Sequence, residues 1–134
     1  MTNPEEKKLT KGNILLVDDD KFLLDMYAMK FSQAGFNAHA SLSVRNAIDT
    51  LRGGFPADAV VFDIIMPQED GFALLETLRM EKLAEKAKLI ALSNQSDESE
   101  KKHAMDLGAT HYIVKASMIP SEVVEAVGAA IKKS

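Results

Sequence analysis

The feature that most constrains the fold is a regular alternation of short apolar runs with longer segments of helical periodicity. The apolar runs cover residues 13–17, 36–40, 58–62, 88–92 and 110–114. The helix-like segments cover residues 21–35, 43–54, 71–83, 97–107 and 120–133. The central runs lack polar residues in alternate positions, which is typical of strands covered on both faces. Five such βα units predict a single α/β domain, a doubly wound parallel sheet with helices on both faces.

The ends of the predicted helices carry recognisable signals. Leu24, Tyr27 and Phe31 recur at helical spacing, and Gly35 follows as a stop. Short polar residues that can cap a helix stand before four of the segments, at Asp20, Ser43, Asp70 and Asp97. Glu100 follows Asp97 by three residues, which is the register of a capping box.

Composition limits the classes of function that remain. The chain has 134 residues, no cysteine and a formal net charge of −4. The absence of cysteine excludes thiolate chemistry. The negative net charge disfavours a nucleic-acid partner, which requires clustered Lys and Arg. The start, MTNPEEKKLTKG, has no apolar signal core, and no run is long enough to span a membrane. We expect a cytoplasmic protein, with residues 1–11 as a flexible tail and residues 12–134 as one domain.

Polar residues stand where four of the five strands end. The first strand is followed by Asp18, Asp19 and Asp20, the third ends at Asp63, the fourth is followed by Ser93 and the fifth by Lys115. In open α/β sheets the functional site lies beyond the carboxyl ends of the strands. These side chains are therefore expected to gather there.

This set of residues predicts phosphoryl-transfer chemistry. One of the three successive acids, Asp20, can cap the first helix, and the remaining negative charge calls for a bound cation. Oxygen ligands without sulfur suit a hard ion such as Mg²⁺. Beside such an ion, Lys115 would balance charge on a phosphoryl group, Ser93 would donate a hydrogen bond and Asp63 would attack.

Four stretches together resemble the receiver domain of two-component response regulators. They are LLVDDD at the first strand, DIIMPQEDG at the third, Ser93 after the fourth and YIVK at the fifth. The resemblance covers nearly the whole chain after the tail. It implies a flavodoxin-like sheet of order 2-1-3-4-5. It also implies either a stand-alone, chemotaxis-regulator-like receiver or a piece of a longer regulator.

The resemblance also implies a role for each residue of the acidic site. Asp63 matches the phosphoacceptor, which takes its phosphoryl group from a histidine kinase or a histidine phosphotransfer protein. Asp19 matches the direct Mg²⁺ ligand, and Asp18 matches its neighbour, which acts through water. The backbone carbonyl of Ile65 matches the third protein ligand. Such a domain is not an enzyme for other substrates and catalyses only its own phosphorylation and dephosphorylation.

Three further residues match the part of a receiver that responds to phosphate. Ser93 matches the switch hydroxyl, Lys115 the phosphate-contacting lysine and Tyr112 the aromatic whose rotamer changes on activation. The family implies a downstream protein target or a homodimer through the face formed by the fourth helix, the fifth strand and the last helix. It also implies that the kinase docks beside the first helix. Phe22 and Met29, apolar residues beyond one buried stripe, fit such a face.

Two residues depart from the family pattern. Ala116 follows Lys115 where the family usually has proline, often with a cis bond. We expect a trans bond here, because a cis bond before a residue other than proline costs several kcal/mol. Asn94 stands after Ser93 where a small residue is usual, and it narrows access to the site.

Three alternatives stay open at the level of sequence. A haloacid-dehalogenase-like phosphohydrolase would use an Asp-x-Asp pair such as Asp18 and Asp20, although Phe22 stands where that family has Thr or Val. A degenerate receiver would act as a binding module without phosphorylation. A flavin-binding flavodoxin-like protein would need a Ser/Thr/Gly-rich phosphate loop after the first strand, where this chain has three acids.

Overall fold

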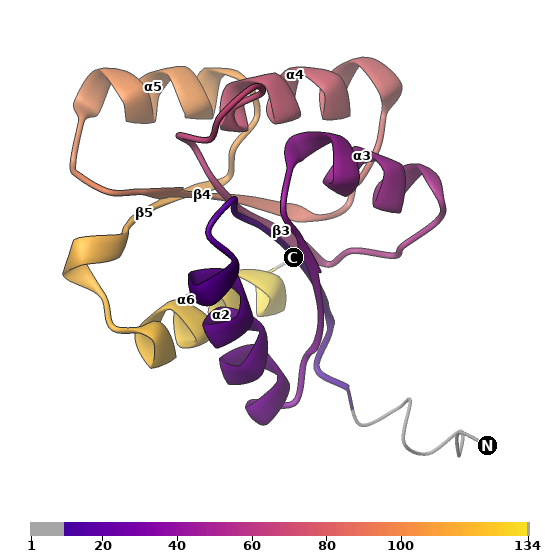
Figure 1. The fold of residues 1–134 in the computed structure, drawn as a ribbon, viewed down its shortest axis with the longest axis vertical. Coiled ribbons are helices and arrows are strands. Elements are labelled where there is room, and N and C mark those ends of the chain that lie inside the picture. Colours follow the sequence, from indigo (N-terminus) through magenta and orange to yellow (C-terminus); the bar gives the residue numbers. More distant parts are fainter. Residues whose placement is uncertain (1–9, 134) are drawn as a thin grey trace.

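The computed structural model describes residues 10–133, which form one sheet with helices on both sides (Figure 1). Residues 1–9 of the expected N-terminal tail lie outside the described residues. The strands are β1 (Asn13–Val17), β2 (Asn37–Ser41), β3 (Ala59–Asp63), β4 (Lys88–Ser93) and β5 (His111–Val114). The helices are α2 (Lys21–Gln33), α3 (Val44–Arg52), α4 (Gly71–Glu81), α5 (Glu98–Asp106) and α6 (Pro120–Lys132), with a 3₁₀ turn, η1 (Lys115–Ser117), after β5.

The sheet has the predicted topology. Its strand order is β2-β1-β3-β4-β5, and all four pairings are parallel. In Figure 1, α3, α4 and α5 lie on one side of the sheet, and α2 and α6 lie on the other. The prediction of a doubly wound α/β fold of order 2-1-3-4-5 is therefore confirmed. The predicted boundaries differ from the observed ones by one or two residues, as is common at element ends.

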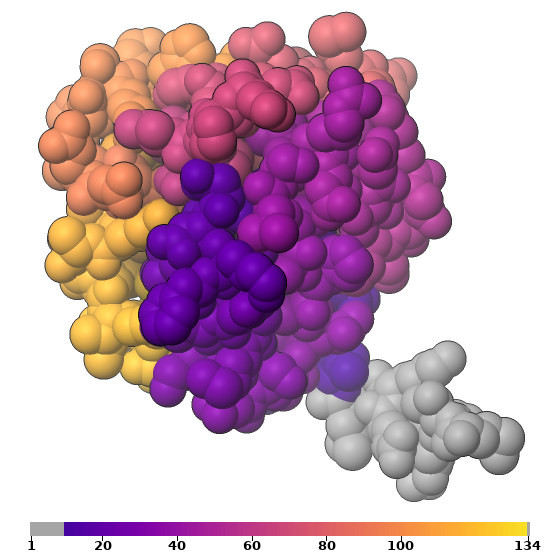
Figure 2. Space-filling model, in the orientation of Figure 1, coloured from indigo at the N-terminus to yellow at the C-terminus, as the bar shows by residue number. Residues whose placement is uncertain are grey.

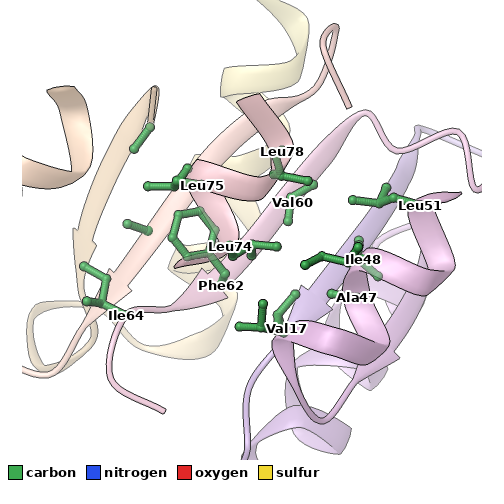
Figure 3. Close-up of a cluster of buried hydrophobic side chains, with 14 of the residues drawn as sticks. Val17, Ala47, Ile48, Leu51, Val60, Phe62, Ile64, Leu74, Leu75 and Leu78 are labelled. Carbon is green, nitrogen blue, oxygen red and sulfur yellow. The ribbon is translucent and has the colours of Figure 1, made fainter. Parts of the chain in front are cut away.

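Two apolar cores fill the spaces between the sheet and its helix layers. One contains Val17, Val60 and Phe62 from the strands together with the inner faces of α3 and α4, as Figure 3 shows. The other contains Ile14, Leu16 and Val61 with the inner faces of α2 and α6. Neighbouring residues of β1 and β3 thus enter opposite cores, which explains why residues 14–17 of β1 and 59–62 of β3 are all apolar.

The predicted helix caps are correct at all four positions. Asp20, Ser43, Asp70 and Asp97 each accept a hydrogen bond from a backbone N–H in the first turn. The expected capping box at Asp97 is wrong in one respect. The carboxylate of Glu100 bonds Ser93 and Tyr112, residues of two strands, rather than the backbone N–H of Asp97.

Among residues 10–133, no helix combines the length and apolar character that a membrane span requires.

Gly71 brings the start of α4 unusually close to the end of β3. A Cβ atom built on Gly71 would lie 2.9 Å from the carbonyl oxygen of Asp63, from Cα of Ile64 and from the ring of Phe62. Two of these neighbours are backbone atoms, which cannot move aside as a flexible side chain could. The Gly after Asp70 in the sequence thus lets α4 pack directly against the strand that carries Asp63.

We predict that Gly71→Ala destabilises the fold by about 1–3 kcal/mol, because the added methyl group overpacks a rigid site. Gly53→Ala is the matched control. Gly53 has a φ of −74°, and a Cβ there would meet its nearest neighbours at ordinary distances of 3.4 and 3.5 Å. The control should be neutral or stabilising by about 0.4–1 kcal/mol. Urea unfolding midpoints measure both, and equal midpoints for the two variants would contradict the prediction.

Candidate functional site

The predicted site residues meet at the carboxyl edge of the sheet. Asp18 and Asp19 follow β1 directly, Asp63 ends β3, and Lys115 begins the turn after β5. In Figure 2, the indigo segment that includes α2 borders the yellow segment that follows β5 on one side and the pink segment above it. Parts of the chain that are distant in sequence therefore share one surface, as the topology of a parallel sheet requires.

Three carboxylates form the centre of this edge. One oxygen each from Asp18, Asp19 and Asp63 can be chosen so that all three lie within 4.8 Å of one another. The ammonium group of Lys115 lies 3.4 Å from Oδ2 of Asp18 and 3.4 Å from Oδ2 of Asp63. When all are ionised, one positive charge faces three negative charges. The cluster therefore has two negative charges that its own lysine does not balance.

Burial makes this imbalance costly. Asp63 is 5% exposed and Asp18 is 4% exposed, whereas Asp19 is exposed. Burial raises the pKa of Asp63; Lys115 opposes this rise, and Asp18 adds to it. Burial alone would lower the pKa of Lys115, but Asp63 and Asp18 outweigh it and raise that pKa. Lys115 thus remains protonated, while Asp63 resists ionisation.

The arrangement fits a hard divalent cation. Oδ1 of Asp63 is buried and has no hydrogen-bond partner among residues 10–133. A buried carboxylate oxygen without a donor needs a compensating group. Oxygen ligands with two excess negative charges are suited to Mg²⁺. Ile65, whose backbone carbonyl was expected as a ligand, follows β3 in the loop before α4, and its side chain is 63% exposed.

Ser93 and Tyr112 belong to a second group of contacts, next to the acidic cluster. The hydroxyl of Ser93 lies 2.6 Å from Oε1 of Glu100, and the hydroxyl of Tyr112 lies 2.8 Å from the same oxygen. Both hydroxyls also reach the backbone carbonyl of Gln95, at 2.7 and 3.1 Å. Within the described chain, none of these hydrogen bonds of Ser93 extends to Asp63. The structure thus joins Ser93 to Tyr112 through Glu100, a residue that the sequence indicated only as a helix-capping partner.

The turn after β5 differs from the usual family pattern as the sequence indicated. Every peptide bond in residues 10–133 is trans, including the bond between Lys115 and Ala116. The expected trans bond is therefore confirmed. The chain then forms the 3₁₀ turn η1, which leaves Lys115 with a side chain only 14% exposed.

Comparison with known proteins identifies the class to which this fold and site belong. Solved structures with the same fold include the chemotaxis protein CheY4 of Vibrio cholerae, with a TM-score of 0.79 and 22% identity over 86% of this chain and 94% of that one. A CheY-like receiver domain of Methanospirillum hungatei aligns with a TM-score of 0.82 and 22% identity over 91% of this chain and 94% of that one.

The family follows from the sequence match. Residues 14–127 match the model of the response regulator receiver domain, and the chain therefore belongs to this family. The response regulator SaeR of Staphylococcus aureus is 30% identical over 112 residues, which are 84% of this chain and 47% of that protein. The transcriptional regulatory protein GltR of Pseudomonas aeruginosa is 29% identical over 124 residues, 91% of this chain and 50% of GltR. This chain spans about half the length of these relatives.

We predict that Asp63→Asn stabilises the metal-free protein at pH 7 by about 1–3 kcal/mol, because it removes a buried negative charge that must share Lys115 with Asp18. The raised folded-state pKa of Asp63 gives the pH dependence. The folded protein holds this proton to higher pH than the unfolded chain does. Wild-type stability relative to Asp63→Asn should therefore fall as pH rises from about 4 through the folded-state pKa.

Urea unfolding in EDTA at several pH values measures this difference. Asp25→Asn is the control, because Asp25 forms an exposed ion pair with Lys21 on α2. Exposed pairs of this kind contribute about 0–1 kcal/mol. The prediction is wrong if Asp63→Asn is no more stable than wild type at pH 7, or if its advantage grows toward acid pH.

Proposed function

We propose that this receiver domain accepts a phosphoryl group on Asp63 from a histidine kinase or a histidine phosphotransfer protein, with Mg²⁺ bound at Asp18, Asp19, Asp63 and the carbonyl of Ile65. One observation carries the proposal. The buried carboxylate of Asp63 has one oxygen 3.4 Å from Lys115, and its other oxygen has no hydrogen-bond partner in the described part of the chain. This carboxylate belongs to a cluster of three acids whose excess negative charge favours a bound cation.

Asp63 and Lys115 each have a defined part in the transfer. An oxygen of Asp63 attacks the phosphorus of a phosphohistidine, the new O–P bond forms, and the N–P bond to the imidazole breaks in line with it. The ammonium of Lys115 faces the same carboxylate and would pair with a phosphoryl oxygen as the carboxylate becomes an acyl phosphate. The bound Mg²⁺ would neutralise charge on the transferring oxygens. Hydrolysis of the acyl phosphate by water would return Asp63 to its starting state.

The same geometry favours Asp63 over Asp18 as the nucleophile, and so argues against the hydrolase alternative. Oδ1 of Asp18 accepts the backbone N–H of Asp20 at 2.9 Å, and its Oδ2 lies 3.4 Å from Lys115. Both oxygens of Asp18 therefore have partners. Asp63 keeps one oxygen free of hydrogen bonds within residues 10–133.

Exposed apolar side chains beside α2 support the proposed docking of a histidine-bearing helix. Phe22 is 83% exposed and Met29 is 52% exposed on this helix. Ile65 and Ile119, which belong to the loops after β3 and β5, are 63% and 62% exposed. A partner that brings a phosphohistidine to Asp63 would cover these side chains, which gives the association an apolar contribution.

Phosphorylation would change the face formed by α5, β5 and α6, and a partner would bind at this face. Ser93 at the end of β4 and Tyr112 on β5 would act as the switch residues. Ala104 is the one buried residue of α5, so this helix is weakly anchored and would respond readily. The partner at this face would be a downstream target protein or a second copy of the chain.

We predict that acetyl phosphate with Mg²⁺ adds one phosphoryl group, about 80 Da, to the protein at Asp63. Asp63→Asn and EDTA should each abolish the addition, because one removes the nucleophile and the other removes the ion. Intact-mass spectrometry measures the product, and hydroxylamine should release it as expected for an acyl phosphate. Phosphorylation of Asp63→Asn to the wild-type level would show that the site is elsewhere.

We further predict that millimolar Mg²⁺ raises the melting temperature of the wild type, because it relieves the repulsion within the acidic cluster. Asp19→Asn should lose most of this increase. Asp20→Asn is the matched control: it removes the same charge one residue later and keeps a good helix cap, since Asn caps as well as Asp. A thermal shift experiment with both variants tests the assignment. An equal response of Asp19→Asn and wild type would contradict it.

A further inference from the structure

Glu100 occupies a position that neither helix capping nor surface charge explains. It lies in the first turn of α5, where Asp97 already caps the backbone N–H groups of Ser99 and Glu100. The carboxylate of Glu100 does not bond the backbone N–H of Asp97, as it would in a capping box. Its Oε1 instead accepts the hydroxyl of Ser93 at 2.6 Å and the hydroxyl of Tyr112 at 2.8 Å.

The hydroxyl of Ser93 has one proton, and two acceptors lie within hydrogen-bond distance of it. It can donate to Oε1 of Glu100 at 2.6 Å or to the carbonyl of Gln95 at 2.7 Å. Its oxygen also accepts the N–H of Gln95 at 3.3 Å. The bond to Glu100 is the stronger donation, because a charged acceptor gives a shorter and stronger hydrogen bond than a neutral carbonyl does. Ser93 must break this bond before it can donate to a phosphoryl group on Asp63.

We propose that Glu100 is a positioning residue for the phosphoryl response, whose carboxylate competes with the phosphoryl oxygens for the Ser93 proton and links the outcome to Tyr112. This inference rests on the proposed function of Asp63. Glu100 thereby influences the equilibrium between the arrangement in which Ser93 bonds Glu100 and the arrangement in which Ser93 bonds a phosphoryl group. An acceptor that binds Ser93 in one state only shifts the balance between the two states.

The shared oxygen supplies the link to Tyr112. When Ser93 leaves, Oε1 of Glu100 loses one of its two hydroxyl donors and keeps Tyr112. Two donors to one carboxylate oxygen compete for the same negative charge, so this partly buried oxygen bonds Tyr112 more tightly once Ser93 has left. Departure of Ser93 therefore strengthens the bond between Glu100 of α5 and the hydroxyl of Tyr112, and the change reaches β5 through this shared carboxylate oxygen.

The decisive experiment compares Glu100→Gln with Glu98→Gln in the presence of Mg²⁺ and beryllofluoride, a phosphoryl mimic that binds the acceptor aspartate. Glutamine has the shape of glutamate and accepts a hydrogen bond, but it lacks the charge. Glu98 is exposed in the same turn of α5, so its substitution removes the same charge from the helix N-terminus. Amide chemical shifts of Ser93 and Tyr112 report the switch, and titration gives the apparent affinity for beryllofluoride.

We predict that Glu100→Gln binds beryllofluoride roughly three- to tenfold more tightly than wild type, the difference between a charged and a neutral acceptor. Before beryllofluoride is added, the Ser93 and Tyr112 amides should already be displaced toward their bound-state shifts. Glu98→Gln should match wild type in both respects. Glu100→Asp, which keeps the charge but withdraws the carboxylate by one methylene, should resemble Glu100→Gln and serves if the latter is poorly folded.

The Ser93→Ala background shows whether Glu100 acts through Ser93. The gain in affinity from Glu100→Gln should vanish in this background, because alanine has no hydroxyl proton for Glu100 and the phosphoryl mimic to share. The inference is overturned if the gain persists in Ser93→Ala, or if Glu100→Gln and Glu98→Gln behave alike while wild type binds beryllofluoride normally. Failure of wild type to bind beryllofluoride with Mg²⁺ is a separate result, since it would overturn the proposed function and the inference together.

Discussion

The buried carboxylate of Asp63 and the ammonium of Lys115, 3.4 Å apart, are the interaction on which the site depends. Lys115 follows β5 at the edge of the sheet and Asp63 ends the central strand β3, so the pair forms only when β3, β4 and β5 are assembled. A single lysine cannot balance Asp18, Asp19 and Asp63 together. The fold thus maintains a local excess of negative charge that an ion or a phosphoryl reaction can use, at some cost to its own stability.

Much of this arrangement could be predicted from the sequence because it depends on local patterns. Apolar runs and helical spacing gave the order of the elements, and the polar residues at strand ends gave Asp18, Asp63 and Lys115. Contacts made by long side chains between elements could not be predicted in this way. Glu100 has the register of a capping residue, and only the positions of β4 and β5 direct its carboxylate to Ser93 and Tyr112. The difference in burial between Asp18 and Asp19 likewise depends on how the loop after β1 turns.

The two ends of the helix layer formed by α3, α4 and α5 are anchored very differently. Arg52 of α3 forms a two-pronged ion pair with Glu81 of α4, and Gly71 allows α4 to contact the backbone of β3 directly. The α5 helix has Ala104 as its one buried residue; it also contacts α4 through the rings of His103 and Phe72, and it contacts β4 and β5 through Glu100. Displacement near Ser93 therefore meets less resistance toward α5 than toward α4.

The sparse anchoring of α5 also bears on how such a domain diverges over evolutionary time. A helix that contributes one small side chain to the core places few demands on the identity of its other residues. Mutations on its outer surface are thus mostly free of folding cost, and selection can alter that surface to suit a new binding partner. Gly71 and the buried strands have no comparable freedom, since even one added methyl group at Gly71 meets backbone atoms. Duplicated copies of this chain could therefore acquire separate partners while keeping the same acidic site at the carboxyl edge of the sheet.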